Sequence, residues 1–324
     1  MLPVQQGDSS MNRHTFSATI VATLGATLGL ATTSALAGKP GGGGTGTYSP
    51  EIAYTSNQGS AWSVYLANAD GTNPVAVYSR RSGSVGRVDF VPGSGPTGGQ
   101  LVFQPTLGSI SVLKYTASAS GIKVISIIPL VTEQSLLVSS VDVSPDGNYV
   151  LYKVANGGNT STLKVIQISN LAVSTVSTGY YREAVWSGDA NLMRIAVSIG
   201  YGVSTGGLPR IEMFTLNPDF SFFSTSGPIY GPCADCTSID IEFARTQDNV
   251  LFGVAGGASS GMWDVSSTGG STVSYGGGNF PCFNANDTKI YYKNGSSVLY
   301  ALDVGTSTNT KVSAGSINAF DVSH

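Results

Sequence analysis

VDVSPDGNYVLYKV, residues 141–154, consists of two short runs of alternating apolar residues joined by Ser-Pro-Asp-Gly. Four of its residues occupy the first, third, fifth and sixth positions of a helix–loop–helix calcium site: Asp142, Ser144, Asp146 and Gly147. Such a site requires Glu at its twelfth position, where this sequence has Lys153, and it requires flanking helices. The alternation on both sides is typical of strands, and Pro145 fixes the φ angle that a β-turn needs. The stretch therefore predicts a strand, a tight turn and a second strand.

The same strand–turn–strand unit recurs along the chain. Six copies of its first strand align on one bulky anchor residue: Phe90, Val143, Trp186, Phe243, Phe283 and Phe320. These anchors recur at roughly the 40–50-residue spacing of four-stranded propeller blades. A third strand sequence recurs between anchors, as in SVYLANADGTN at 63–73. No helical period interrupts these units, so the repeat indicates a β-propeller.

The two ends of this region carry complementary parts of one unit. EIAYTS at 51–56 has the second-strand pattern, and INAFDVS at 317–323 has the first-strand pattern. A blade completed from both ends closes the ring and removes exposed sheet edges. We therefore predict an all-β, six-bladed β-propeller over residues 48–324, with four-stranded antiparallel blades and the ring closed by pairing of the N- and C-terminal strands.

These repeats resemble those of TolB-type β-propellers, in which a strand ends in Ser-Pro-Asp-Gly before the next begins. The resemblance rests on VDVSPDGNYVLYKV at 141–154 and VYLANADGTN at 64–73, and it covers roughly residues 48–324. It implies a WD40-like, TolB-type propeller but no particular activity, because many proteins of unrelated activity share the repeat. The α/β domain that precedes the propeller in TolB is replaced here by glycine-rich sequence.

The first part of the chain has the pattern of an export signal. Residues 11–37 have a short basic start at Arg13, continue through a long run of small and apolar residues, and end in Ala-Leu-Ala. This pattern predicts a cleaved secretory signal peptide over residues 1–37, with Met11 as the true start; the alternative is an uncleaved membrane anchor. Residues 38–47 are predicted to form a glycine-rich linker. We expect a periplasmic or secreted protein without a stable membrane anchor after cleavage.

Charge and histidine content exclude several classes of function. The formal net charge is -3, and no basic patch indicates a nucleic-acid partner. The chain has two histidines: His14 lies in the predicted signal peptide, and His324 is the last residue. A Ser-His-Asp or Cys-His site would depend on that last residue, so we expect none. Chemistry based on carboxylates alone stays open.

The three cysteines are Cys233, Cys236 and Cys282. The first two form a Cys-x-x-Cys pair, but the second pair and the histidines that a zinc site would use are lacking. In an oxidising compartment this spacing favours a disulfide between Cys233 and Cys236. A bridge to Cys282, or free thiols, is the alternative.

Three acidic residues occupy the same position in different repeats. Asp89, Asp142 and Glu242 each come directly before an anchor residue. Because first strands line the central channel of a propeller, these side chains are expected to lie at one depth. They would either hold Ca²⁺ or another cationic ligand, or accept hydrogen bonds from the backbone of neighbouring blades. No other cofactor is expected.

Aromatic residues give the candidates for a ligand surface. Trp62 and the pair Tyr180-Tyr181 lie near predicted loops, whereas Trp186 and Trp263 align with core positions of the repeat. We therefore expect an exported, non-enzymatic propeller that acts as a protein-interaction or ligand-binding scaffold, with recognition carried by loops. The alternatives are a carboxylate-based polysaccharide hydrolase or lyase and a glycan-binding module.

Overall fold

The computed structural model describes residues 48–57, 61–132, 137–189, 191–200, 207–295, 297–313 and 316–323. All of them belong to one compact unit of the chain, Leu36–His324. The predicted signal peptide (1–37), the linker (38–47) and both histidines lie outside the described residues. No described residue is helical, and none belongs to a helix that is long and apolar enough to cross a membrane.

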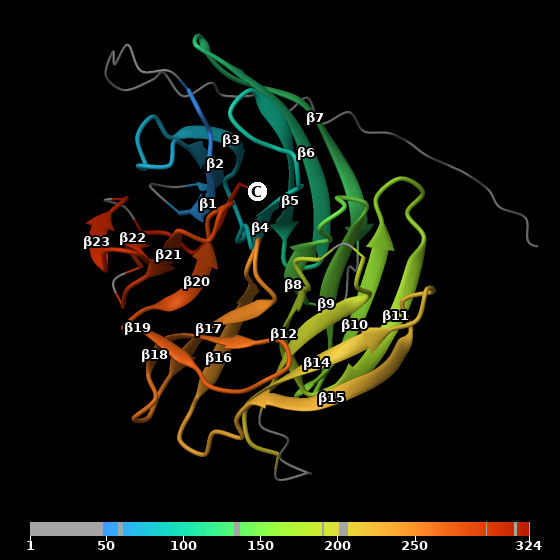
Figure 1. The fold of residues 1–324 in the computed structure, drawn as a ribbon. Helices are drawn as coiled ribbons and strands as arrows, with labels where there is room; N and C mark the ends of the chain where they lie inside the picture. Colours follow the sequence, from blue (N-terminus) through green and yellow to red (C-terminus); the bar gives the residue numbers. More distant parts are fainter. Residues whose placement is uncertain are drawn as a thin grey trace, which may run out of the picture. The chain divides into compact units, whose positions relative to one another are not determined.

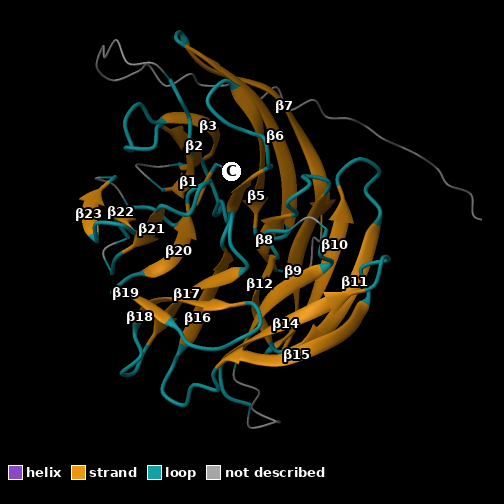
Figure 2. Ribbon diagram, in the orientation of Figure 1, coloured by secondary structure: helices purple, strands orange, loops and turns teal. Residues whose placement is uncertain are grey.

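The described strands form six antiparallel, four-stranded sheets arranged as blades around a centre (Figures 1 and 2). The innermost strands are β4 (Val88–Phe90), β8 (Val138–Val143), β12 (Tyr181–Trp186), β16 (Ser238–Phe243), β20 (Asn279–Phe283) and β24 (Ala319–Val322). The second strands are β1 (Ile52–Ser56), β5 (Gly98–Thr106), β9 (Tyr149–Gly157), β13 (Arg194–Ile199), β17 (Asn249–Ala255) and β21 (Lys289–Lys293). The protein is thus an all-β, six-bladed propeller, as the repeat predicts.

The outer half of each blade completes the sheet. The third strands are β2 (Trp62–Ala67), β6 (Ser109–Ser118), β10 (Thr160–Gln167), β14 (Arg210–Leu216), β18 (Gly261–Ser266) and β22 (Leu299–Asp303). The outermost strands are β3 (Val75–Arg80), β7 (Gly121–Thr132), β11 (Val173–Gly179), β15 (Phe222–Tyr230), β19 (Val273–Gly276) and β23 (Thr308–Lys311).

The ring is closed by the two ends of the propeller. β24 pairs antiparallel with β1, in the register Ile52↔Val322 and Ala53↔Asp321, and so becomes the innermost strand of the blade that β1, β2 and β3 build. This pairing confirms the predicted closure. The register also shows that the prediction was wrong about one anchor: Val322, two residues after Phe320, is the equivalent of Phe90 in its blade. The strand pattern alternates, so aligning on the larger ring shifted the repeat by one period of the strand.

The quoted stretch forms β8, a turn and β9. Gly147 has a φ of +72°, and its N–H donates to the Ser144 carbonyl at 2.8 Å, which closes the turn. The Asp146 carboxylate accepts hydrogen bonds from the Ser144 hydroxyl at 2.5 Å and from the Asn148 N–H at 3.0 Å. A positive φ favours glycine, and an acceptor side chain stabilises the turn locally. These residues therefore bond to one another within the turn.

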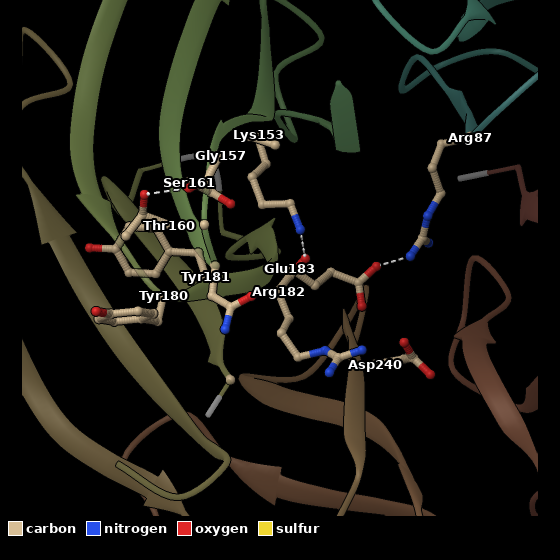
Figure 3. Close-up of a pocket in the computed structure, with 14 residues that line it drawn as sticks. Arg87, Lys153, Gly157, Thr160, Ser161, Tyr180, Tyr181, Arg182, Glu183 and Asp240 are labelled. Atoms are coloured by element: carbon tan, nitrogen blue, oxygen red, sulfur yellow. Dashed lines mark hydrogen bonds and ion pairs between the residues drawn. The ribbon is translucent and has the colours of Figure 1, made fainter. Parts of the chain in front are cut away.

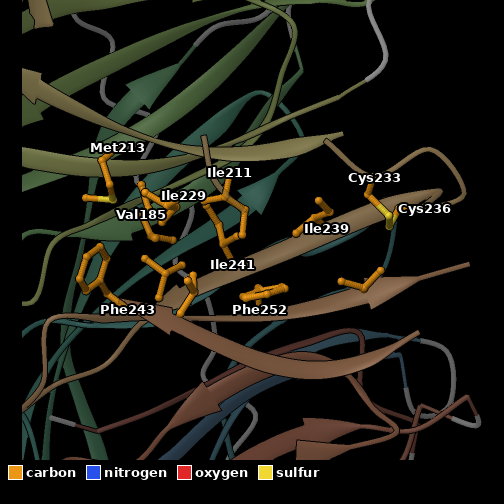
Figure 4. Packing of buried hydrophobic residues seen from close by; sticks show 14 residues of the cluster. Val185, Ile211, Met213, Ile229, Cys233, Cys236, Ile239, Ile241, Phe243 and Phe252 are labelled. Atoms are coloured by element: carbon orange, nitrogen blue, oxygen red, sulfur yellow. A yellow bond between two sulfur atoms is a disulfide. The ribbon is translucent and has the colours of Figure 1, made fainter. Parts of the chain in front are cut away.

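Neighbouring blades pack face to face through apolar side chains (Figure 4). In one such cluster, Ile211 and Met213 of β14 lie with Ile241 of β16 and Phe252 of β17 from the next blade. The burial of these side chains removes apolar surface from water, which is the main stabilising contribution to folding. Trp186 is buried in the adjoining cluster, and Trp263 is partly buried against the one shown.

A disulfide joins Cys233 and Cys236 at one end of this cluster (Figure 4). It lies in the segment between β15 and β16. Cys282, at the fourth position of β20, is a buried free thiol.

Candidate functional site

The acidic residues of the inner strands link the blades to one another. The Asp89 carboxylate accepts a hydrogen bond from the Val143 N–H at 2.5 Å, and the Asp142 carboxylate accepts one from the Trp186 N–H at 2.5 Å. Both side chains are buried. Burial raises the pKa of each carboxyl well above its usual range, with further contributions from nearby acids. Each of these two acids thus bonds to the backbone of the next blade.

A fourth acid, Asp321, belongs to the same set. It comes directly before the corrected anchor Val322, and its carboxylate accepts a hydrogen bond from the Phe90 N–H at 2.7 Å. The Cys282 thiol also donates to it at 3.4 Å. Asp321 could have been predicted from the sequence, because it is an acid directly before an apolar residue of an inner strand. It was missed because the repeat was aligned on Phe320 instead of Val322.

Glu242 has a different partner. Its carboxylate lies 3.2 Å from the Arg245 guanidinium, which also lies 3.6 Å from Asp321. Arg245 follows β16, and its guanidinium contacts acids of two inner strands, β16 and β24. Burial raises the pKa of Glu242 to about 7, although the charge of Arg245 opposes the shift. The centre therefore already contains a cation that belongs to the protein.

These acids do not converge as metal ligands. Within the part of the chain that the structure describes, one group brings three such ligand atoms within 4.8 Å of one another, and it consists of Cys233, Asp235 and Cys236. Its two sulfur atoms are joined in the disulfide. The calcium hypothesis for Asp89, Asp142 and Glu242 stays a sequence-based prediction. The hydrogen bonds that Asp89 and Asp142 accept from the backbone of neighbouring blades correspond to the alternative interpretation.

A cavity of about 540 Å³ lies at the end of the channel where the inner strands begin (Figure 3). Five charged side chains line it: Arg87, Lys153, Arg182, Glu183 and Asp240. They come from four blades, because Arg87 precedes β4, Lys153 is on β9, residues 182 and 183 open β12, and Asp240 is on β16. A cavity of this size is in the range of small-molecule sites.

Glu183 holds two of these elements together. One of its oxygens is paired with the Arg87 guanidinium, and the other accepts a hydrogen bond from the Ile241 N–H at 2.8 Å. Lys153 donates from its ammonium group to the Arg182 carbonyl. Burial lowers the pKa of Lys153, while the negative charge of Glu183 opposes that shift. Because both oxygens of Glu183 are bonded, its role at the cavity is to position Arg87.

Asp240 is the acid at the cavity that is left available. Its carboxylate has no hydrogen bond or ion pair with any residue that the structure describes. Burial and the charge of Glu183 raise the pKa of Asp240 to about 7, and three cations around it, Arg87, Arg182 and Lys293, oppose the shift. An available acid with a raised pKa beside a cavity is typical of a functional site.

A second, smaller cavity of about 40 Å³ adjoins the first and shares Arg87, Glu183 and Asp240 with it. Phe280 lies at its edge, with the Lys293 ammonium 4.1 Å and the Arg87 guanidinium carbon 5.8 Å from the ring centre. Burial lowers the pKa of Lys293 to about 8. Positive charge thus continues from the cavity across the mouth of the channel.

The three aromatic candidates have different places. Tyr180 is half-buried and lines the cavity. Tyr181 also borders it, but its ring packs against Phe214 and its hydroxyl is bonded to Ser177 at 2.8 Å. Trp62 packs against the apolar cluster between the first two blades and is not a lining residue of either cavity. Tyr180 is therefore the candidate whose ring faces the cavity.

The charged lining was not foreseen from the sequence. Arg87, Lys153, Arg182 and Asp240 lie on different repeats and at different positions within them. Single surface charges of this kind have no sequence signature. The GYYRE segment at 179–183 was the part of the site that sequence analysis found, through its tyrosines.

The described fold is similar to solved propellers. One chain of a nidogen–laminin complex has a TM-score of 0.61, with 10% identity over 85% of this chain and 98% of that chain. An oligogalacturonate lyase in complex with manganese has a TM-score of 0.51, with 7% identity over 83% of this chain and 79% of that chain. At such identity these similarities show the propeller fold alone. No protein-family model matches the chain, and no curated protein matches it in sequence.

Proposed function

We propose that this chain is an exported, non-enzymatic binding scaffold that holds its ligand or protein partner at the mouth of the channel. The observation that carries the proposal is the cavity of about 540 Å³, where side chains from four blades converge. A rigid ring that presents such a surface from several blades is well suited to recognition. We expect the protein to act in the periplasm or outside the cell, after removal of the signal peptide, without binding nucleic acid.

The bonding of the ionisable groups supports binding over catalysis. Two carboxylates face the cavity, Glu183 and Asp240. Glycoside hydrolysis by acid pairs uses one carboxylate as nucleophile or base and a second as acid, and both must reach the substrate. Both oxygens of Glu183 are engaged by Arg87 and Ile241, so that pair is incomplete.

The resemblance to TolB-type repeats also belongs to this proposal. A propeller of that type is expected to bind another protein through one face of the ring. The similarity to a chain of a nidogen–laminin complex is compatible with such a role, although it shows the fold alone.

Site-specific photo-crosslinking in the cell of origin tests the proposal. A photoreactive residue at Tyr180 is compared with one at Asn309, which lies on the outermost strand β23 and away from the cavity. A specific adduct from position 180 but not from position 309 supports binding at the mouth. Equal labelling at both positions, or none at 180, overturns it.

The raised pKa of Asp240 supports an enzyme as the second candidate function. An acid with a pKa raised to about 7 is suited to donate a proton at neutral pH. The candidate is a polysaccharide hydrolase or lyase that uses Asp240 as its acid. Turnover of a glycan panel that is lost in Asp240→Asn would establish it, whereas turnover that survives the substitution would point to contamination.

A further inference from the structure

The cavity at the mouth of the channel has an excess of positive charge. Arg87, Lys153 and Arg182 oppose Glu183 and Asp240, and Glu183 is already paired with Arg87. Arg182 is exposed, and toward the residues that the structure describes it uses one N–H, for the Thr237 carbonyl at 3.2 Å, out of five donors. Lys153 likewise retains donors beyond the one given to the Arg182 carbonyl. An anionic ligand group is favoured here.

The rest of the lining is hydroxylic and amidic. Asn159 lies in the turn between β9 and β10, Thr160 and Ser161 open β10, and Tyr180 lines the same cavity (Figure 3). Ala155 is the one aliphatic residue in the lining. A peptide bound through apolar side chains needs anchor pockets, and a peptide bound as an added strand needs an open sheet edge; this lining offers neither. A ring with many hydroxyl groups matches it better.

We propose that this cavity binds an acidic saccharide, whose carboxylate pairs with Arg182 and Lys153 while a sugar ring packs on Tyr180. The available oxygens of Asp240 accept hydrogen bonds from ring hydroxyls, and Glu183 holds Arg87 in place beside them. The inference rests on the proposed binding function and names the class of ligand for the same cavity. It requires no reaction of the saccharide.

Calorimetric titration of the full chain with uronic-acid tetrasaccharides tests this inference. The panel contains galacturonate, mannuronate and guluronate forms, each beside its carboxyl-reduced counterpart. We expect at least one acidic form to bind and its reduced form to bind far more weakly. Replacing an ionic hydrogen-bond donor in Arg182→Gln is expected to weaken binding roughly tenfold or more.

Matched variants separate charge at the cavity from charge elsewhere. Arg81 is exposed and is not a lining residue, so Arg81→Gln is expected to bind like the parent. Tyr180→Ala should weaken binding by removing the stacking surface, and thermal unfolding shows whether each variant is folded.

Three results overturn the inference: no acidic form binds, reduced and acidic forms bind equally, or Arg182→Gln and Arg81→Gln behave alike. The proposed function is decided separately, because a crosslinked protein at position 180 supports it even when no saccharide binds. If an acidic form binds and is cleaved, the ligand class holds and the non-enzymatic proposal fails.

Discussion

The Asp89 carboxylate accepts a hydrogen bond from the Val143 N–H at 2.5 Å, so the inner strand of one blade is bonded to the inner strand of the next. The same relation recurs from β24 to β4 and from β8 to β12. The equivalent position in β12 is Val185, whose side chain has no hydrogen-bond acceptor. Glu183 of the same strand accepts a hydrogen bond from the Ile241 N–H instead, and this bond links β12 to β16. Carboxylate-to-backbone hydrogen bonds therefore join five consecutive inner strands.

Removing one of these acids should destabilise the whole ring. Asp89→Ala leaves the buried Val143 N–H without its acceptor, which costs about 1–3 kcal/mol of unfolding free energy. Urea unfolding followed by circular dichroism measures the loss. Lys123→Ala, at an exposed position of β7, is the control and should leave the midpoint unchanged. Equal behaviour of the two variants would show that the inter-blade bond contributes nothing to stability.

The unfolding free energy should also depend on the protonation of Asp240. Its pKa is 3.8 without the protein environment and about 7 in the folded chain, because burial disfavours the anion near Glu183. The contribution of Asp240 is complete below pH 3.8 and is lost as the pH rises through 7. Arg87, Arg182 and Lys293 also face this group, and they limit the shift.

Asp240→Asn removes that loss. The variant should be more stable than the parent at pH 8 and close to it at pH 4, as measured by urea unfolding at both values. Asp70 gives a control of opposite sign, because hydrogen bonds from Thr72 lower its pKa. The contribution of Asp70 to the unfolding free energy is therefore present at high pH and is lost as the pH falls. A variant that is stabilised equally at both pH values would contradict a raised pKa at Asp240.

The fold followed from local features of the sequence, but one repeat was misaligned. Turn residues such as Gly147 and the alternation around them are set by neighbours in the chain, so they are visible without a structure. Phe320 and Val322 lie on the same side of one strand, and size alone made Phe320 the better match. The pairing with Ile52 resolves the choice, and it joins residues from opposite ends of the propeller.

The site depends on distances that the sequence does not contain. Arg87 meets Glu183 because the ring brings the segment before β4 close to the start of β12, two blades further along. Neither residue has a distinctive neighbour in the chain. Asp89 and Asp142 were found because they share a repeat position, whereas the cavity residues share only an end of the channel.

The cysteines should give a simple chemical readout. Titration of thiols in denaturant is expected to find one free thiol per chain, Cys282, without reductant and three after reduction. A Cys233→Ala, Cys236→Ala double variant should remain folded, because the bridge closes a short loop and such loops give less than the roughly 3 kcal/mol of a 15-residue loop. Three thiols without reductant would contradict the disulfide.

A pair of glycine substitutions tests how closely the last blade packs on the closing blade. Gly71 and Gly93 both have positive φ, +78° and +81°, so alanine strains the backbone at each by about 1–2 kcal/mol. A Cβ on Gly71 would lie 2.0 Å from the Val312 carbonyl oxygen, whereas one on Gly93 would have nothing within 4 Å. Gly71→Ala must therefore also move the β2–β3 turn away from the segment after β23.

We expect Gly71→Ala to lose clearly more unfolding free energy than Gly93→Ala in urea titrations of the two variants. The excess reports the contact between the β2–β3 turn and Val312, because the backbone strain is common to both. That contact exists only if β24 closes the ring beside β1, which brings the two blades together. Equal losses for the two variants would mean that the turn does not rest on the last blade.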